Sequence, residues 1–278
     1  MLEKAVREKR LAHAYVFSGP SQVGKRAVAK RLAQFLICQD GTGCDSCLHC
    51  RSFASGAHAD YLEILGDEAI KIEPIRELGY KLALMPYAAS HKVAVIDNAH
   101  NLTTEAANAL LKVLEEPKAH TVMILVTDNS HRLLPTISSR AQKIHFGPLG
   151  DEEFGSWLAG SGLPEPDASF AGKPGYVLAM SADETLAERN QEHSLTLKSF
   201  LHGSLGERLQ MAAELAEKET IELKAMFDHW LHHLQRLLRE SPAPAITRKI
   251  RGLLRAQRLL DQNVNSKLLL AELMVATS

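Results

Sequence analysis

Residues 14–25 read Ala14-Tyr-Val-Phe-Ser18-Gly19-Pro-Ser-Gln-Val-Gly24-Lys25, a short apolar run followed by a glycine-lysine loop. Gly19, Gly24 and Lys25 have the spacing of a phosphate-binding loop. In such a loop, backbone N–H groups surround an anion at a helix N-terminus and the lysine contacts the outer phosphates. Because the loop follows a strand-like run and leads into a helix, the stretch predicts an α/β fold with a parallel sheet.

The residue after the lysine departs from the usual pattern. An active loop carries Ser or Thr there, and the hydroxyl is a ligand of Mg²⁺. Arg26 stands at that position, offers no acceptor atom to a metal and carries a charge that repels one. We therefore expect a loop that is poorly suited to hydrolyse a nucleotide. Whether it still binds ATP and Mg²⁺ is open at this point.

Short apolar runs bounded by polar or turn residues predict four more buried strands, and helices are expected between them. The expected strands after Ala14–Ser18 are Tyr61–Ile64, Val93–Asp97, Val122–Thr127 and Lys143–Phe146. The expected helices are Arg26–Ile37, Ile75–Leu84 and Thr103–Leu114, the last with a cap at its start and Pro117 after its end. This alternation predicts a doubly wound sheet with the phosphate loop at the carboxyl end of its first strand.

The pattern changes after residue 147, where Gly and Pro become frequent, and beyond residue 185 only helical periodicity is found. Apolar residues at three- and four-residue spacing predict helices at Glu152–Ala159, Met211–Lys218, Ile221–Arg239, Thr247–Leu260 and Ser266–Val275. The sequence thus predicts an α/β domain over 1–147, a small helical lid over 148–184 and a helical collar for oligomerisation over 185–278.

The cysteines form one cluster, with the spacing Cys-x5-Cys-x2-Cys-x2-Cys at Cys38, Cys44, Cys47 and Cys50. Four thiolates in one short stretch supply the tetrahedral ligand set of a structural Zn²⁺. Two alternatives stay open: four reduced thiols in a surface loop, and a site in which His49 replaces one thiolate. A complete set of four protein ligands indicates a structural rather than a catalytic metal.

Composition excludes some classes of function. The net charge of −1 gives no general attraction for nucleic acid, which counts against a zinc-bearing DNA-binding module that acts alone. No apolar run approaches the roughly 20 residues of a membrane span, and the first residues do not form a secretory signal. We expect a cytoplasmic protein without membrane contact.

A second motif supports a nucleotide site. Asp97 ends an apolar run, where an aspartate that anchors Mg²⁺ lies in ATPases of this build. A glutamate that polarises the attacking water usually follows, but Asn98 stands there and cannot act as a base. The alternative for Asp97 is a helix cap.

Several segments resemble the clamp-loader subunits of bacterial DNA polymerase III, within the AAA+ class, and most specifically the delta-prime group. The resemblance spans roughly residues 11–146, and its most specific string is Asn108-Ala-Leu-Leu-Lys-Val-Leu-Glu-Glu-Pro117. The other segments are Leu11–Pro20, the cysteine cluster, Val93–Asp97 and Leu133–Ala141. The family carries a zinc module at the same insertion point, which supports the metal assignment.

The resemblance implies roles for single residues. Gly19, Gly24 and Lys25 would form the nucleotide loop, with Asp97 as the second motif. Thr127 would be the sensor of the γ-phosphate. Arg140, in the pair Ser139-Arg140, would reach across a subunit boundary to the ATP of a neighbouring motor subunit. The alternative for Arg140 is an ordinary solvated charge.

The resemblance also implies partners: motor subunits and delta in a heteropentamer that opens the sliding clamp and places it on primed DNA. That assembly belongs to the DNA polymerase III holoenzyme, a nucleotidyltransferase complex. Arg26, Asn98 and Tyr176, which stands where many active relatives have Arg, favour a rigid subunit with little or no ATPase of its own. The short stretch before the loop, which lacks the family's adenine-covering residues, points the same way. The rival within the class is an ATP-hydrolysing motor subunit.

Overall fold

The computed structural model describes residues 2–8, 10–163, 165–166, 170–260, 262 and 264–276. The chain divides into two compact units, Met1–Pro148 and Leu149–Ser278. The predicted division of the second unit into a lid and a collar at residue 184 stays a prediction. Among the described residues, none of the helices combines the length and apolar character that crossing a bilayer requires.

The first unit is built on a five-stranded parallel sheet with the order β2-β3-β4-β1-β5. The predicted strands are confirmed to within one residue at each end. Because every strand runs in the same direction, all carboxyl ends lie at one edge of the sheet. The strands are β1 (Ala14–Ser18), β2 (Tyr61–Ile64), β3 (Lys92–Ile96), β4 (Thr121–Thr127) and β5 (Gln142–His145).

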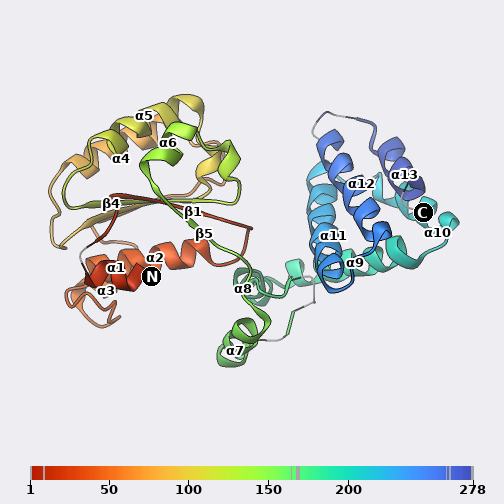
Figure 1. The fold of residues 1–278 in the computed structure, drawn as a ribbon, viewed down its shortest axis with the longest axis horizontal. Helices are drawn as coiled ribbons and strands as arrows, with labels where there is room; N and C mark the ends of the chain where they lie inside the picture. The colour runs from red at the N-terminus through yellow and green to blue at the C-terminus, as the bar shows by residue number, and fades with distance from the viewer. Residues whose placement is uncertain are drawn as a thin grey trace. The chain divides into compact units, whose positions relative to one another are not determined.

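Helices cover both faces of this sheet (Figure 1). Alternate residues of each strand point to opposite sides: Val16 packs in the cluster that includes α4, α5 and α6, while Phe17 packs in the cluster that includes α2. Burial on both faces explains why the central strands β1, β3 and β4 are mostly apolar, whereas the edge strand β5 is largely exposed and polar. The helices are α1 (Leu2–Arg7), α2 (Lys25–Ile37), α3 (Leu48–Ala54), α4 (Ile72–Ala83), α5 (Thr104–Glu115) and α6 (Pro135–Arg140), with short 3-10 turns η1 (Ala99–Asn101) and η2 (Ser130–Arg132).

Two helix starts show how sequence signals act. Thr103 caps α5 as predicted, since its Oγ1 accepts a hydrogen bond from the Ala106 N–H at 3.2 Å. Helix α4 begins at Ile72 rather than at the predicted Ile75. Pro74 lies within the first turn of α4, where its missing N–H has no partner to lose, so it does not mark the helix start. Helices α3 and α6 were not predicted.

The second unit is all helical in its described residues, as predicted. Its core packs Phe200, Phe227 and Trp230 with residues from α9 to α13. Two of the expected helices begin well before the predicted residue. Helix α12 begins at Pro244 rather than Thr247. Helix α10 begins six residues before Met211, because Ser204 and Glu207 form a capping box. The helices are α7 (Asp151–Ser161), α8 (Pro174–Ala182), α9 (Glu184–His202), α10 (Leu205–Leu215), α11 (Thr220–Glu240), α12 (Pro244–Leu260) and α13 (Ser266–Ala276).

Candidate functional site

The sheet topology brings most of the predicted nucleotide-site residues to one edge. The phosphate loop follows β1, Asp97 follows β3, and Thr127 ends β4, which lies between those two strands. In the parallel register Ser18 is opposite Thr127, so the start of the loop lies beside the predicted sensor residue. Ligands of open α/β sheets bind at this edge.

Both loop glycines have conformations that favour glycine. Gly19 has φ 146°, and a Cβ there would lie 2.0 Å from the carbonyl oxygen of Phe146. The Phe146 N–H in turn donates to the Ser18 carbonyl at 2.7 Å, so the loop begins in close contact with the end of β5. Gly24 has φ 92° and opens α2. The local backbone therefore has the form that a phosphate loop needs.

Lys25 is engaged inside the loop. Its side chain is buried, and its Nζ donates to the carbonyl oxygens of Gly19 at 2.9 Å and Pro20 at 2.5 Å. Burial lowers the pKa of Lys25, although the Asp128 and Asp97 carboxylates act in the opposite direction. The ammonium group thus closes the loop on itself.

Arg26 joins two carboxylates. Its Nε lies 2.9 Å from Glu63 Oε1 and 3.7 Å from Asp97 Oδ2. Burial of Glu63 works against its charged form, but the contact with Arg26 outweighs it and lowers the pKa of that carboxyl. A guanidinium lies where a divalent cation would need acidic oxygens free, so the residues present do not fit an Mg²⁺ site.

Glu63 was missed by sequence reasoning. It lies on β2 and also faces Lys30, whose Nζ is 3.4 Å from Glu63 Oε2. The available signal was an acidic residue inside the apolar strand Tyr61–Ile64, because a charge in a covered strand needs a partner.

Asp97 and Asn98 lie at the end of β3 as expected. Burial raises the pKa of Asp97, while the Asn98 N–H, which donates to Asp97 Oδ1 at 3.0 Å, and the charge of Arg26 oppose that rise. Asn98 adopts φ 47°, a left-handed conformation that Asn tolerates well. Its amide has no proton-accepting function comparable to a glutamate.

Thr127 is fully buried, and its hydroxyl is used within the same unit. The Oγ1 accepts from the Asn129 N–H at 3.1 Å and lies 3.3 Å from His100 Nδ1. That imidazole nitrogen is also 3.2 Å from Asp128 Oδ1. The predicted sensor therefore lies at the carboxyl edge of the sheet, as expected. Its hydroxyl belongs to a small hydrogen-bonded network with His100 and Asp128 that sequence reasoning did not identify.

Arg140 lies apart from that set of contacts. It ends α6, its side chain is 38% exposed, and its Nη2 lies 2.9 Å from Glu115 Oε1 at the end of α5. Its Nη1 donates to the Thr136 carbonyl at 3.1 Å. The guanidinium is on the surface of its unit rather than in the core.

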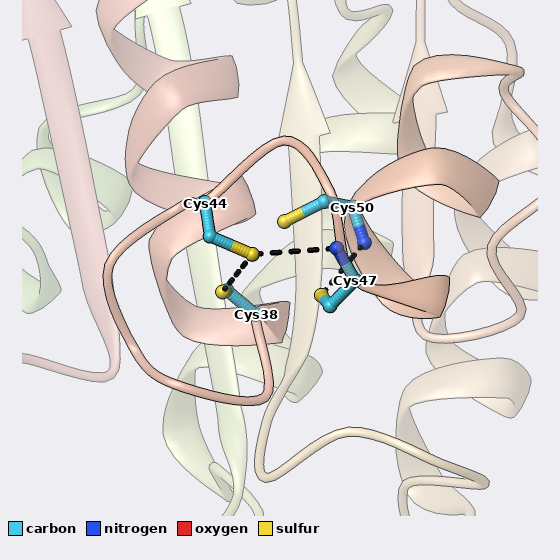
Figure 2. Close-up of side chains that lie close together, drawn as sticks. All are labelled: Cys38, Cys44, Cys47 and Cys50. Atoms are coloured by element: carbon cyan, nitrogen blue, oxygen red, sulfur yellow. Dashed lines mark hydrogen bonds between the residues drawn. The ribbon is translucent and has the colours of Figure 1, made fainter.

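The four cysteines converge as predicted. Their Sγ atoms all lie within 4.8 Å of one another, and those of Cys38 and Cys44 are 3.7 Å apart. Two sulfurs bonded to one tetrahedral Zn²⁺ at 2.3 Å are about 3.8 Å apart, so the donor set fits this metal. Figure 2 shows the sulfur atoms facing a common space between the loop and α3.

Backbone donors support the cluster. The Cys47 N–H donates to Cys44 Sγ and the Cys50 N–H to Cys47 Sγ, each at 3.4 Å, so that Cys47 also caps α3. Without metal, burial raises the pKa of Cys50 to about 12. At Cys38 burial also disfavours the thiolate, but backbone N–H groups outweigh it and lower the pKa to about 5. His49 contacts His58 at 3.0 Å, a pairing that gives it a partner other than a metal.

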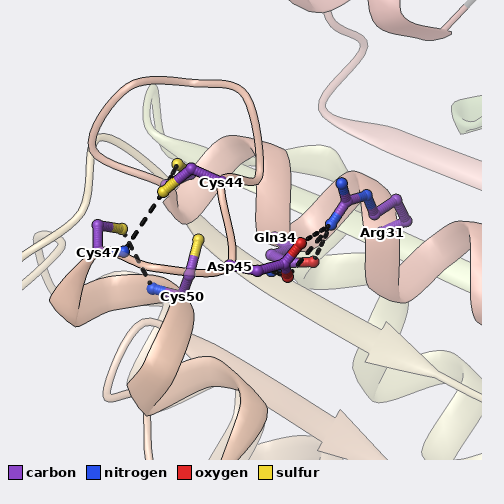
Figure 3. Close-up of polar contacts among 7 residues, drawn as sticks. Arg31, Gln34, Cys44, Asp45, Cys47 and Cys50 are labelled. Atoms are coloured by element: carbon purple, nitrogen blue, oxygen red, sulfur yellow. Dashed lines mark hydrogen bonds and ion pairs between the residues drawn. The ribbon is translucent and has the colours of Figure 1, made fainter.

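The cysteine loop is also tied to α2 (Figure 3). Asp45, between Cys44 and Cys47, accepts a hydrogen bond from Gln34 Nε2 at 2.6 Å and lies 3.4 Å from Arg31 Nη1. The hydrogen bond from Gln34, followed by the charge of Arg31, lowers the pKa of Asp45. The loop is positioned by these contacts before any metal is considered.

The sequence model of the family described as DNA polymerase III, delta subunit, matches residues 1–150. The chain belongs to this family of clamp-loader subunits. Two curated relatives represent the two groups in it. The delta-prime subunit of Pseudomonas aeruginosa is 37% identical over 161 residues, 56% of this chain and 49% of its own length. The tau subunit of Bacillus subtilis is 37% identical over 148 residues, 52% of this chain and 26% of its own length.

This chain thus spans less than half the length of either relative. A solved structure of a DNA polymerase III gamma subunit-related protein from Thermotoga maritima aligns over 99% of this chain and 98% of its own. Its TM-score is 0.51 at 19% identity. That similarity confirms the predicted fold, an AAA+-like α/β unit followed by a helical region.

Proposed function

We propose that this chain is a delta-prime-like subunit: a rigid, cytoplasmic member of a clamp loader that supplies Arg140 in trans and does little or no ATP hydrolysis itself. The observation that carries the proposal is the position of Arg26. Its guanidinium contacts Glu63 and approaches Asp97, the residue that would otherwise anchor Mg²⁺. A nucleotide in this loop would lack the metal that neutralises charge on the transferring phosphoryl group.

The exposed Arg140 supports the second half of the proposal. An arginine held on the surface by a single carboxylate can contact a phosphate of another subunit, for which its planar fork is well suited. The partners would be motor subunits and delta in a heteropentamer, with primed DNA and the sliding clamp contacted through the complex. Family membership supports partners of this kind.

The test uses the complete complex, reconstituted with the Arg140→Ala chain. Loss of an arginine finger lowers the rate at the site that it serves by about 10³–10⁵. We therefore expect the DNA-stimulated ATP turnover at that neighbouring site to fall by this factor. Arg132→Ala, at another exposed arginine of the same unit, is the matched control and should leave turnover unchanged. Equal turnover by wild type and Arg140→Ala would refute the role in trans.

The rival is an ATP-hydrolysing motor, which the similarity to tau subunits favours. It predicts Mg²⁺-dependent turnover by the purified chain, abolished by Lys25→Ala. Our proposal predicts no turnover above background for the purified chain, with or without that substitution.

For the cysteine cluster we propose one structural Zn²⁺ held by Cys38, Cys44, Cys47 and Cys50. The convergence of four sulfurs supports it. Elemental analysis of the purified protein should find one zinc per chain, and Cys44→Ser should lower the zinc content. A zinc-free protein with four thiols reactive in the native state would contradict this assignment.

A further inference from the structure

The ends of α5 and α6 meet at an ion pair outside the nucleotide loop. Arg140 Nη2 lies 2.9 Å from Glu115 Oε1, and Arg140 Nη1 donates to the Thr136 carbonyl at 3.1 Å. Glu115 is the first glutamate of the Leu-Glu-Glu-Pro segment noted in the sequence. That glutamate has had no role in the function described so far.

Both partners are mounted on helices that the core holds in place. Leu110 and Leu114 of α5 and Ile137 of α6 are buried in the same cluster, so the last turns of the two helices are packed together. The backbone positions of Glu115 and Arg140 are therefore fixed relative to each other. The pair joins two rigid elements rather than two loops.

The geometry leaves the guanidinium able to bind a phosphate while the pair persists. Arginine has five N–H donors. The contact with Glu115 uses one on Nη2, and those with the Thr136 carbonyl and, at 3.5 Å, with Ser139 Oγ use Nη1, so Nε and the second N–H of Nη2 remain. The Arg140 side chain is 38% exposed, so the other donors can reach a group that approaches from outside. A carboxylate that already restrains the side chain reduces the rotamer freedom lost on binding phosphate.

We propose that Glu115 is a positioning residue for Arg140. Its carboxylate holds the guanidinium in one orientation at the subunit surface, so that Arg140 loses little rotamer freedom when it contacts the neighbour's ATP. This inference rests on the proposed function, since it assumes that Arg140 acts in trans. An exposed ion pair changes an equilibrium by up to about 5-fold. The effect of Glu115 should be several-fold, far below that of Arg140 itself.

The experiment compares reconstituted complexes that carry Glu115→Ala, Glu115→Gln or Glu116→Ala. Glu115→Ala should lower kcat of DNA-stimulated ATP turnover about 3- to 5-fold and leave KM for ATP unchanged, because an arginine finger acts on the transition state. Glu115→Gln keeps an oxygen acceptor and should recover part of the rate. Glu116 is also exposed, is described by the structure and is not paired with Arg140, so Glu116→Ala should have no effect.

A double variant separates positioning from other roles. In the Arg140→Ala background, Glu115→Ala should cause no further loss, because its only target is gone. The same several-fold loss in that background would overturn the inference, as would an unchanged kcat for Glu115→Ala. Co-elution with the partner subunits and an unchanged Tm verify assembly. If Arg140→Ala alone left turnover intact, the proposed function itself would fail, so the two failures are distinguishable.

Discussion

The phosphate loop and the end of α6 each present an arginine, and the surroundings of the two differ. Arg26 lies between Glu63 and Asp97, whose side chains are less than one-fifth exposed. Arg140 has a half-exposed carboxylate as its charged partner. In the loop, the cations neutralise acids of their own unit and support its fold. At α6 the ion pair is exposed and is expected to contribute little to the fold, which is compatible with the proposed contact of Arg140 with another subunit.

The largest expected effect concerns the backbone of the loop. In Gly19→Ala the new Cβ would meet the Phe146 carbonyl at 2.0 Å in a conformation with φ 146°. We expect the free energy of unfolding to fall by about 3 kcal/mol or more, because the clashing atom is backbone and cannot rotate away. Urea denaturation of the purified chain measures it. Gly56→Ala has φ 73° but nothing within 4 Å and should cost only about 1 kcal/mol. Equal losses would show that the Phe146 backbone, which follows β5, does not constrain the loop.

Removal of the loop arginine should have the next largest effect. Arg26→Ala leaves Glu63 and Asp97 without their shared cation, and we expect a loss of about 1–3 kcal/mol in unfolding free energy. Lys30→Ala removes a longer contact, 3.4 Å from Glu63, made by a side chain that is 42% exposed. It should cost less than about 1 kcal/mol. Equal losses for the two variants would show that Arg26 stabilises the unit no more than Lys30 does.

Asp97 gives a pH-dependent prediction. Burial raises its folded-state pKa above the ordinary 3.8, so its contribution to stability is fully present below pH 3.8 and is lost as the pH rises through the folded-state pKa. At pH 7 the ionised carboxylate therefore destabilises the folded state, and Asp97→Asn should raise the unfolding free energy by up to about 1 kcal/mol. The gain should vanish below pH 3.8. A variant less stable than wild type at pH 7 would mean that the carboxylate is better solvated or paired than its burial implies.

The smallest effect is expected at the other arginine. In the isolated chain, Arg140→Ala should change the unfolding free energy by less than about 0.5 kcal/mol, because an exposed ion pair contributes little. The contrast with Arg26→Ala is the point of the measurement. A loss of about 2 kcal/mol would place Arg140 among the structural cations and weaken its assignment to a neighbour's ATP.

Much of the fold followed from local sequence. The central strands β1, β3 and β4 were predicted to within one residue because a covered parallel strand is a continuous apolar run with polar ends. Thr103 and the loop glycines were recognisable because caps and left-handed positions restrict the residue type. Helix α3 was not predicted. Its sequence, Leu48–Ala54, includes the last of the clustered cysteines and has no clear three- or four-residue spacing of apolar residues.

The contacts that decide the site were beyond local sequence. Glu63 meets Arg26 from a strand 37 residues away, and their pairing depends on β2 lying next to β3 in the sheet. Glu115 and Arg140 meet because α5 packs on α6, which periodicity does not report. The sequence thus indicated which charged residues could belong to the site, whereas the fold determined which carboxylate each arginine pairs with.

The most direct test is a structure of the reconstituted complex with a non-hydrolysable ATP analogue and primed DNA. The quantity to measure is the distance between the Arg140 guanidinium nitrogens and the γ-phosphate oxygens of the neighbouring subunit's nucleotide. The account predicts contact at about 2.7–2.9 Å, the range of charge-assisted hydrogen bonds, with Arg26 still on Glu63. Arg140 remote from every nucleotide, or Mg²⁺ bound at Asp97 with Arg26 displaced, would contradict it.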